Sequence, residues 1–178
     1  MFVAMAGLPG TGKSAIAARL AERLNGVVLS KDEFRARLFQ KIDYSREQDD
    51  AAMQAVYAAA RELVATGQPV IIDGRTFSRS HQIADLFAAA EALSERPLII
   101  ECICDQAIVR QRLDRDSAAG THLAGNRTFA MYREVRNRAE ALTVPRLVLD
   151  TGVLTLAECV SRAEGYLVNR EAEPSSLT

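Results

Sequence analysis

The chain has 178 residues, of which 48% are hydrophobic and 25% charged, a balance typical of one soluble globular domain. Its formal net charge of −1 excludes the global positive field of a protein that wraps long nucleic acid. No apolar run approaches the roughly 20 residues that span a bilayer, and the N-terminal segment lacks the features of a signal peptide. With three cysteines, two of them in one apolar run, these features predict a cytoplasmic protein with reduced thiols and no membrane association.

Strand-like and helix-like segments alternate along the chain. Short apolar runs bounded by turn residues predict strands at residues 2–6, 26–30, 69–73, 97–104 and 146–150. Apolar residues at helical spacing predict helices at residues 13–24, 47–67, 80–93, 106–116, 127–142 and 154–168, and a short helix that ends at Phe39. Such an alternation predicts an α/β domain, residues 1–168, with a parallel sheet covered on both faces, followed by a polar tail, residues 169–178.

The segment GLPGTGKS, residues 7–14, joins the first predicted strand to the first predicted helix. It fits the pattern G-x-x-x-x-G-K-[ST], in which glycines let successive backbone N–H groups point at phosphate oxygens and the helix dipole favours an anion. We expect Lys13 to reach the β- and γ-phosphates and Ser14 to ligate Mg²⁺. The residues predicted to bind a nucleoside triphosphate here are Gly7, Leu8, Pro9, Gly10, Thr11, Gly12, Lys13 and Ser14.

Asp32 follows the second predicted strand, close to where the γ-phosphate is expected. A carboxylate there can accept the proton of an incoming hydroxyl, as a kinase base does. Two other roles fit its position: Ser30 or Asp32 caps the following helix, or Asp32 holds a Mg²⁺-bound water. Arg35 lies three residues later on the same helical face, where it either clamps an acidic or phosphorylated acceptor or is a solvated surface arginine.

Asp73 ends the third predicted strand, where P-loop proteins carry an acidic residue that holds Mg²⁺ through water. The next residue is Gly74, whereas hydrolytic motor ATPases typically place a glutamate there to polarise water. An N-K-x-D motif is also missing, which argues against a GTPase. The sequence therefore favours phosphoryl transfer over hydrolysis, and we expect Asp73 and Arg75 to line the acceptor site.

An arginine-rich segment follows the fourth predicted strand. Residues 110–138 contain seven arginines against three acidic residues, a surplus that suits a polyanion such as ATP. Arginines such as Arg112 and Arg115, on or beside a mobile lid at about residues 113–126, can close over the transferring phosphoryl group and exclude water. The alternative is a solvated helix in which Arg112 pairs with Asp116.

Five stretches, GLPGTGKS, SKDEFR, VIIDGRTFSR, VRQRLDRD and LVLDT, together resemble one group of P-loop kinases. The group includes polynucleotide 5′-kinase domains, zeta toxins, chloramphenicol phosphotransferase and gluconate kinase, and many members are labelled AAA-family ATPases. The resemblance covers residues 1–168. It implies a five-stranded parallel sheet of order 2-3-1-4-5, ATP with Mg²⁺ as the donor, and a hydroxyl acceptor.

The resemblance also implies roles for individual residues. Asp32 matches the group's catalytic base, and Arg35 matches the arginine that follows this base by three residues. Asp73 matches the acidic residue that ends a strand, and Arg112 matches the lid arginine. Asp150 and Thr151 match the loop that passes the adenine. Two departures stand out. The group's second lid arginine usually lies four residues after the first, where this chain has Asp116, with Arg115 one residue early. The stretch DGRTFS replaces the D-[ST]-N stretch of polynucleotide kinases.

We therefore predict an ATP-dependent kinase that phosphorylates a hydroxyl of a small molecule. One alternative is a polynucleotide, nucleotide or nucleotide-sugar kinase, which the arginine surplus supports and the neutral net charge opposes, so that a nucleic-acid partner is not favoured. The other alternative is a nucleotide-binding ATPase that transfers nothing.

Overall fold

Five parallel strands form a single sheet in the computed structural model, which describes residues 1–119 and 127–171. The strands are β1 (Phe2–Ala6), β2 (Val27–Ser30), β3 (Val70–Asp73), β4 (Pro97–Ile103) and β5 (Leu147–Asp150). Their order across the sheet is β2-β3-β1-β4-β5, which confirms the order implied by the family resemblance. Ser30 lies opposite Asp73 in the register, so the residues that follow β2 emerge beside the carboxyl end of β3.

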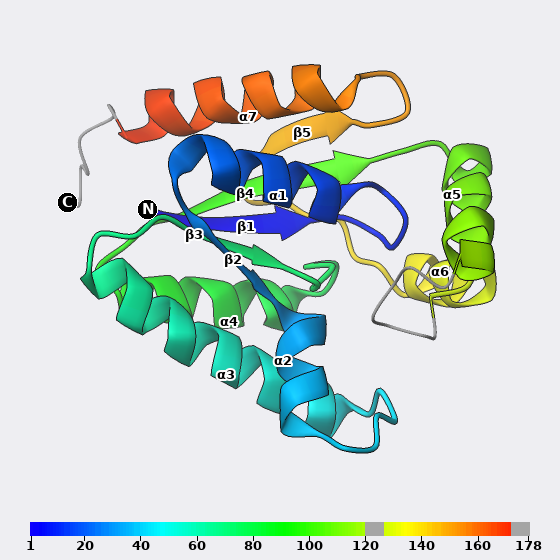
Figure 1. The fold of residues 1–178 in the computed structure, drawn as a ribbon, viewed down its shortest axis with the longest axis horizontal. Helices are drawn as coiled ribbons and strands as arrows, with labels where there is room; N and C mark the ends of the chain where they lie inside the picture. Colours follow the sequence, from blue (N-terminus) through cyan, green and yellow to red (C-terminus); the bar gives the residue numbers. More distant parts are fainter. Residues whose placement is uncertain (120–126, 172–178) are drawn as a thin grey trace.

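Helices cover both faces of this sheet (Figure 1). The helices are α1 (Lys13–Leu24), α2 (Lys31–Leu38), α3 (Arg46–Ala65), α4 (Ser80–Glu91), α5 (Gln106–Ala119), α6 (Phe129–Asn137) and α7 (Leu156–Glu171). Helices α1 and α7 lie on one face and α3 and α4 on the other, while α5 and α6 lie beyond the carboxyl ends of the strands (Figure 1). Successive residues of β1 therefore enter different cores: Val3 and Met5 pack toward α1 and α7, whereas Phe2 and Ala4 pack toward α3 and α4.

Local sequence signals explain most helix boundaries. The Ser30 side chain accepts a hydrogen bond from the Glu33 N–H and so caps α2. At the C-terminal end of α3, Gly67 has a φ of +79° and its N–H donates to the Val64 carbonyl, as expected of a residue that ends a helix. Helix α7 starts two residues later than predicted, because Thr155 and Glu158 form a reciprocal capping box.

The largest error in the predicted elements concerns α6, which ends at Asn137 and not at residue 142. The segment that follows α6 instead contacts the start of α4. The Glu140 N–H donates to the Ser78 carbonyl at 2.8 Å, and the Glu140 carboxylate accepts from the Ser80 N–H at 2.7 Å. Glu140 thus caps α4 from 60 residues away, a long-range contact that helical spacing does not reveal. Helix α7 also continues beyond its predicted end through residues 169–171, and the rest of the predicted tail, residues 172–178, lies outside the described part of the chain.

Candidate active site

The loop between β1 and α1 has the left-handed glycine geometry of a phosphate cradle. Gly7, Gly10 and Gly12 have φ values of +124°, +78° and +85°. A side chain at Gly7 is excluded, because its Cβ would lie 2.2 Å from the Cys102 carbonyl oxygen. Gly12 is the N-cap of α1, so the first N–H groups of the helix face the end of the loop.

Lys13 is the first residue of α1 and bends back over the loop. Its Nζ donates to the Leu8 carbonyl at 2.8 Å, and the residue is only 7% exposed. Burial lowers its pKa from 10.5 to about 8, while the negative charge of Asp73 opposes that shift. The ammonium group therefore lies next to the phosphate cradle and is shielded from water. The loss of its hydration is unfavourable, and a bound phosphate would offset it.

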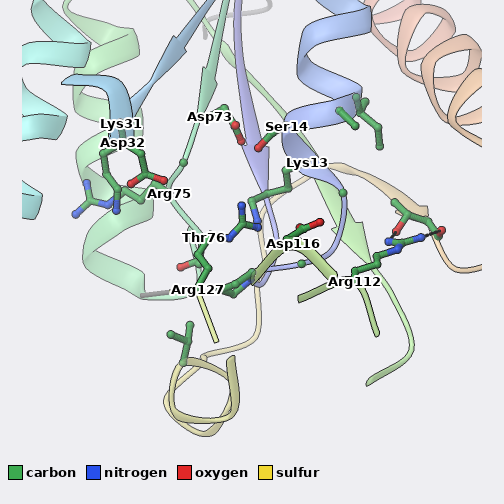
Figure 2. Close-up of a pocket in the computed structure, with 18 of the residues that line it drawn as sticks. Lys13, Ser14, Lys31, Asp32, Asp73, Arg75, Thr76, Arg112, Asp116 and Arg127 are labelled. Carbon is green, nitrogen blue, oxygen red and sulfur yellow. Dashed lines mark hydrogen bonds between the residues drawn. The ribbon is translucent and has the colours of Figure 1, made fainter. Parts of the chain in front are cut away.

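Ser14 and Asp73 present oxygen atoms to one another across the floor of the site (Figure 2). Asp73 is 5% exposed and its Oδ1 is buried with no hydrogen-bond partner among the described residues. A buried carboxylate oxygen without a partner beside a free hydroxyl fits Mg²⁺, which usually takes one or two protein oxygens together with waters and phosphate. These two oxygens are therefore the candidate ligands.

Asp32 belongs to a chain of four charged side chains that joins α2 to α3. Arg35 donates to Asp32 Oδ1 at 2.7 Å and also to Asp49 Oδ1. Asp49 accepts a further hydrogen bond from Lys31. Arg35 is 4% exposed and lies 5.4 Å from the centroid of the Tyr44 ring, so it is not the solvated surface arginine of the alternative interpretation. Asp32 follows the N-cap of α2, lines the cavity and is held by Arg35.

Gly74 brings the end of β3 against the start of α2. Its φ is +94°, and a Cβ there would lie 3.1 Å from the Lys31 backbone nitrogen and 3.5 Å from that of Asp32. A glutamate, which motor ATPases place at this position, would be both strained and obstructed. The absence of a side chain at Gly74 therefore allows the start of α2 to approach the end of β3.

Arg75 is 2% exposed and borders the same cavity. Its two terminal nitrogens lie 3.3 Å from Asp85 Oδ2 and 3.6 Å from Asp50 Oδ1. The charge of Arg75 is thus partly balanced before any acceptor binds.

Arg112 crosses from α5 to the loop after β5. Its Nη1 and Nη2 donate to the side chain and the carbonyl of Thr151 at 2.9 and 2.7 Å, and Thr151 Oγ1 donates to the Thr11 carbonyl at 2.8 Å. These contacts replace the predicted alternative in which Arg112 pairs with Asp116. The Asp150 carboxylate accepts from the Gly152 N–H at 2.9 Å and does not line the cavity, so its part in this structure is to shape the loop.

One cavity of about 900 Å³ is lined by most of these residues, namely Lys13, Ser14, Lys31, Asp32, Arg35, Asp49, Asp73, Arg75, Arg112 and Thr151. It runs from the Thr151–Cys159 segment past the P-loop to Asp32 and Tyr44, and the inner side of α6 borders it. Pro9, Gly10, Gly12, Lys13 and Ser14 line it, whereas Gly7, Leu8 and Thr11 face a second cavity of about 560 Å³ on the other side of the loop. Arg115 is exposed and lines the large cavity from α5, and lid residues 120–126 lie outside the described part of the chain.

A family model described as an AAA domain, AAA_33, matches residues 2–142, most of the chain. The chain belongs to this family. No curated protein matches its sequence significantly.

Solved structures share the whole fold. A sugar kinase from Janibacter sp. HTCC2649 matches with a TM-score of 0.70 and 15% identity over 94% of both chains. A gluconokinase from Sinorhizobium meliloti 1021 matches with a TM-score of 0.64 and 16% identity over 95% of this chain and 92% of its own. The APS kinase of Mycobacterium tuberculosis, solved with AMPPNP and APS, matches with a TM-score of 0.66 and 17% identity over 94% and 96%. The fold of this AAA_33 member is therefore that of the P-loop kinases, as the resemblance implied.

Several residues that line the site were not predicted from the sequence. They are Lys31, Asp49, Arg127, Met131, Glu134 and Arg138. Asp49 lies in a helix that reads as an ordinary amphipathic segment, and only the packing of α2 on α3 reveals its contacts. A signal for Arg127 did exist in the local arginine surplus, but nothing in the spacing distinguished it from its neighbours.

Proposed function

We propose that the protein is an ATP-dependent kinase that transfers the γ-phosphoryl group to a hydroxyl of a small molecule. The observation that carries this proposal is the position of Asp32, which lines the same cavity as Lys13 and Ser14 and is oriented by the buried Arg35. Gly74 supports it further, since a water-polarising glutamate cannot be built there without displacing α2. The fold shared with a sugar kinase and an APS kinase is consistent with this chemistry.

In this mechanism the loop N–H groups and Lys13 hold the phosphates, and Arg112 with Thr151 borders the nucleotide. Ser14 and Asp73 would hold Mg²⁺, and the bound ion would supply charge neutralisation. Asp32 accepts the proton of the acceptor hydroxyl as its oxygen bonds to the γ-phosphorus. The bond from that phosphorus to the β,γ-bridging oxygen breaks, so that the products are a phosphate ester and ADP.

A panel of acceptors with γ-labelled ATP tests the proposal. We expect slow hydrolysis in the absence of an acceptor and one labelled ester from a panel of polyols, sugars, amino alcohols and nucleosides. An acceptor among nucleotides or 5′-hydroxyl oligonucleotides would shift the function to the nucleotide kinase alternative. ATP turnover with no labelled ester from any acceptor, and unaffected by Asp32→Asn, would establish the non-transferring ATPase instead.

Asp32→Asn separates the base from a metal-shell role. For a general base we expect kcat to fall by roughly 10²–10⁴-fold with little change in nucleotide affinity. A variant whose rate is restored by raising the Mg²⁺ concentration would place Asp32 in the metal shell. Asp114→Asn is the matched control, because Asp114 is an exposed carboxylate on α5 that pairs with Arg110 and does not line the cavity.

A further inference from the structure

Arg75 is a buried cation whose positive charge is incompletely paired. It follows Gly74 and borders the cavity on the same side as Asp32 (Figure 2). Its Nη1 donates to Asp85 Oδ2 at 3.3 Å, whereas its Nη2 lies 3.6 Å from Asp50 Oδ1, beyond hydrogen-bond distance. Its Nε is buried and has no hydrogen-bond partner among the residues that the structure describes. Nε and Nη2 form one edge of the guanidinium group, and such an edge can donate two parallel hydrogen bonds to one carboxylate or phosphate.

The two carboxylates near Arg75 lie outside the cavity. Asp50 and Asp85 do not line it, and their side chains are 50% and 44% exposed. Both carboxylates remain hydrated, so they compensate the buried guanidinium group only in part. Burial raises the pKa of the neighbouring Tyr57 to about 12, even though the charge of Arg75 lowers it, so Tyr57 adds no negative charge. Because Asp50 is half exposed, it can turn toward solvent when an anion enters from the cavity and pairs with Arg75.

The other cations on the wall formed by α2 and α3 are closely paired. Lys31 donates to Asp49 at 2.5 Å, and Arg35 contacts both Asp49 and Asp32. Arg75 is therefore the cation beside Asp32 whose charge is least neutralised by the protein. A buried cation with a free donor edge at a cavity indicates that the ligand of this part of the cavity is an anion.

Arg75 also lies next to the proposed base. A Cβ at Gly74 would lie 3.5 Å from the Asp32 backbone nitrogen, so Arg75 and Asp32 project from adjoining segments of the backbone. We propose that the acceptor is a small hydroxylated anion, whose carboxylate or phosphate pairs with Arg75 while one of its hydroxyls reaches Asp32. The oxyanion orients the acceptor and takes no part in the bonds that form and break. This inference rests on the proposed function, which supplies the transfer to a hydroxyl.

Matched pairs of acceptors test the substrate class with γ-labelled ATP. Glycerate and glycerol 3-phosphate are compared with glycerol, and glucuronate is compared with glucose. We expect the labelled ester to come from an anionic member, with kcat/KM at least about 100-fold above that of its neutral counterpart. The preference between glycerate and glycerol 3-phosphate distinguishes a carboxylate from a phosphate. An acceptor that is phosphorylated equally well without an ionised group would overturn this inference and leave the kinase proposal intact, whereas no ester from any acceptor would refute the kinase proposal itself.

Arg75→Gln tests whether Arg75 makes the contact. It should raise the KM for the anionic acceptor by about 10- to 100-fold and change the kcat and the KM for ATP by less than about threefold. An unchanged KM for the acceptor would overturn the assignment. Arg61→Gln is the matched control, because Arg61 is exposed on α3 and lines neither cavity.

Asp85→Asn separates anion binding from a structural role of Arg75. This variant removes the carboxylate that holds Nη1 but keeps the guanidinium group, so the KM for the anionic acceptor should stay the same or fall. If the ion pair between α4 and Arg75 served only to hold the fold, Asp85→Asn and Arg75→Gln would raise this KM alike. That result would overturn the proposal, and Asp85→Asn gives a readout even if Arg75→Gln does not fold.

Discussion

The donor side of the cavity is built on one loop, residues 7–14, of which Pro9, Gly10, Gly12, Lys13 and Ser14 line it, whereas the acceptor side is assembled from α2, α3 and the end of β3. On the donor side the phosphate-binding groups are backbone N–H groups, and glycines at positive φ set the direction in which these groups point. On the acceptor side the working groups are side chains, which are held by the Asp49–Arg35–Asp32 contacts. A backbone site depends on local sequence, while a side-chain network depends on tertiary packing. The two sides should therefore respond differently to substitution.

The donor side should tolerate the loss of its lysine least. Lys13→Ala is expected to reduce phosphoryl transfer at least about 10³-fold, because no other side chain of α1 can replace a cation buried beside the loop. Single-turnover rates with the identified acceptor measure this loss. Lys41→Ala is the control, since Lys41 is exposed and does not line the cavity. A near-normal rate for Lys13→Ala would contradict the assignment of the P-loop.

Gly74 lies where the donor and acceptor sides meet, and adding a methyl group there should lower the stability of the protein. Gly74→Ala is expected to destabilise the protein by about 2–3 kcal/mol, because positive φ and a 3.1 Å approach to the Lys31 nitrogen act together. Gly67→Ala shares the positive φ but has no atom within 4 Å, so it should cost only about 1 kcal/mol. Denaturant unfolding measures both values. Equal losses would show that the contact with α2 contributes nothing.

The difference between the two sides also explains what the sequence could predict. The strand order followed from the family resemblance, and the alternation of apolar strands and helices predicted the layers. Ser30 was one of the two candidate caps of α2, and this contact could be foreseen because capping is local.

Features that depend on long-range contacts could not be predicted from the sequence. The end of α6 depends on Glu140 reaching Ser80, and the environment of Asp32 depends on Asp49 from the next helix. The Asp150 carboxylate accepts a hydrogen bond from the Gly152 N–H in its own loop, a contact that the sequence did not reveal, and its part in nucleotide binding stays a prediction. Periodicity carries no information about any of these contacts.

On the acceptor side, Asp49 is expected to act through Arg35. Asp49→Asn should lower kcat by about 10- to 100-fold and leave the KM for ATP unchanged, because it removes the charge that anchors Arg35 and so loosens Asp32. Glu47→Gln is the matched control, since both acids lie in the first turn of α3 and share its dipole. A loss of stability with no change in kcat would reduce Asp49 to a structural role, as would an equal effect in the control.

The smallest expected effect concerns pH and belongs to the donor side alone. Burial lowers the pKa of Lys13 to about 8, so the free protein loses this proton as the pH rises through 8. Bound phosphate favours the charged form and raises the pKa of Lys13, so nucleotide binding takes up a proton above pH 8. Affinity for AMPPNP should therefore fall by about tenfold between pH 7.5 and pH 9.

Calorimetry in buffers of different ionisation enthalpy measures that proton uptake directly. In Lys13→Met the binding that remains should show no such pH dependence. The free variant should also unfold at a higher temperature at pH 7, because it no longer buries a charged ammonium group. In the wild-type protein this buried charge lowers the stability fully below pH 8 and progressively less between pH 8 and 10.5. A pH dependence that persists in Lys13→Met would assign the proton to another group and remove this distinction between the two sides.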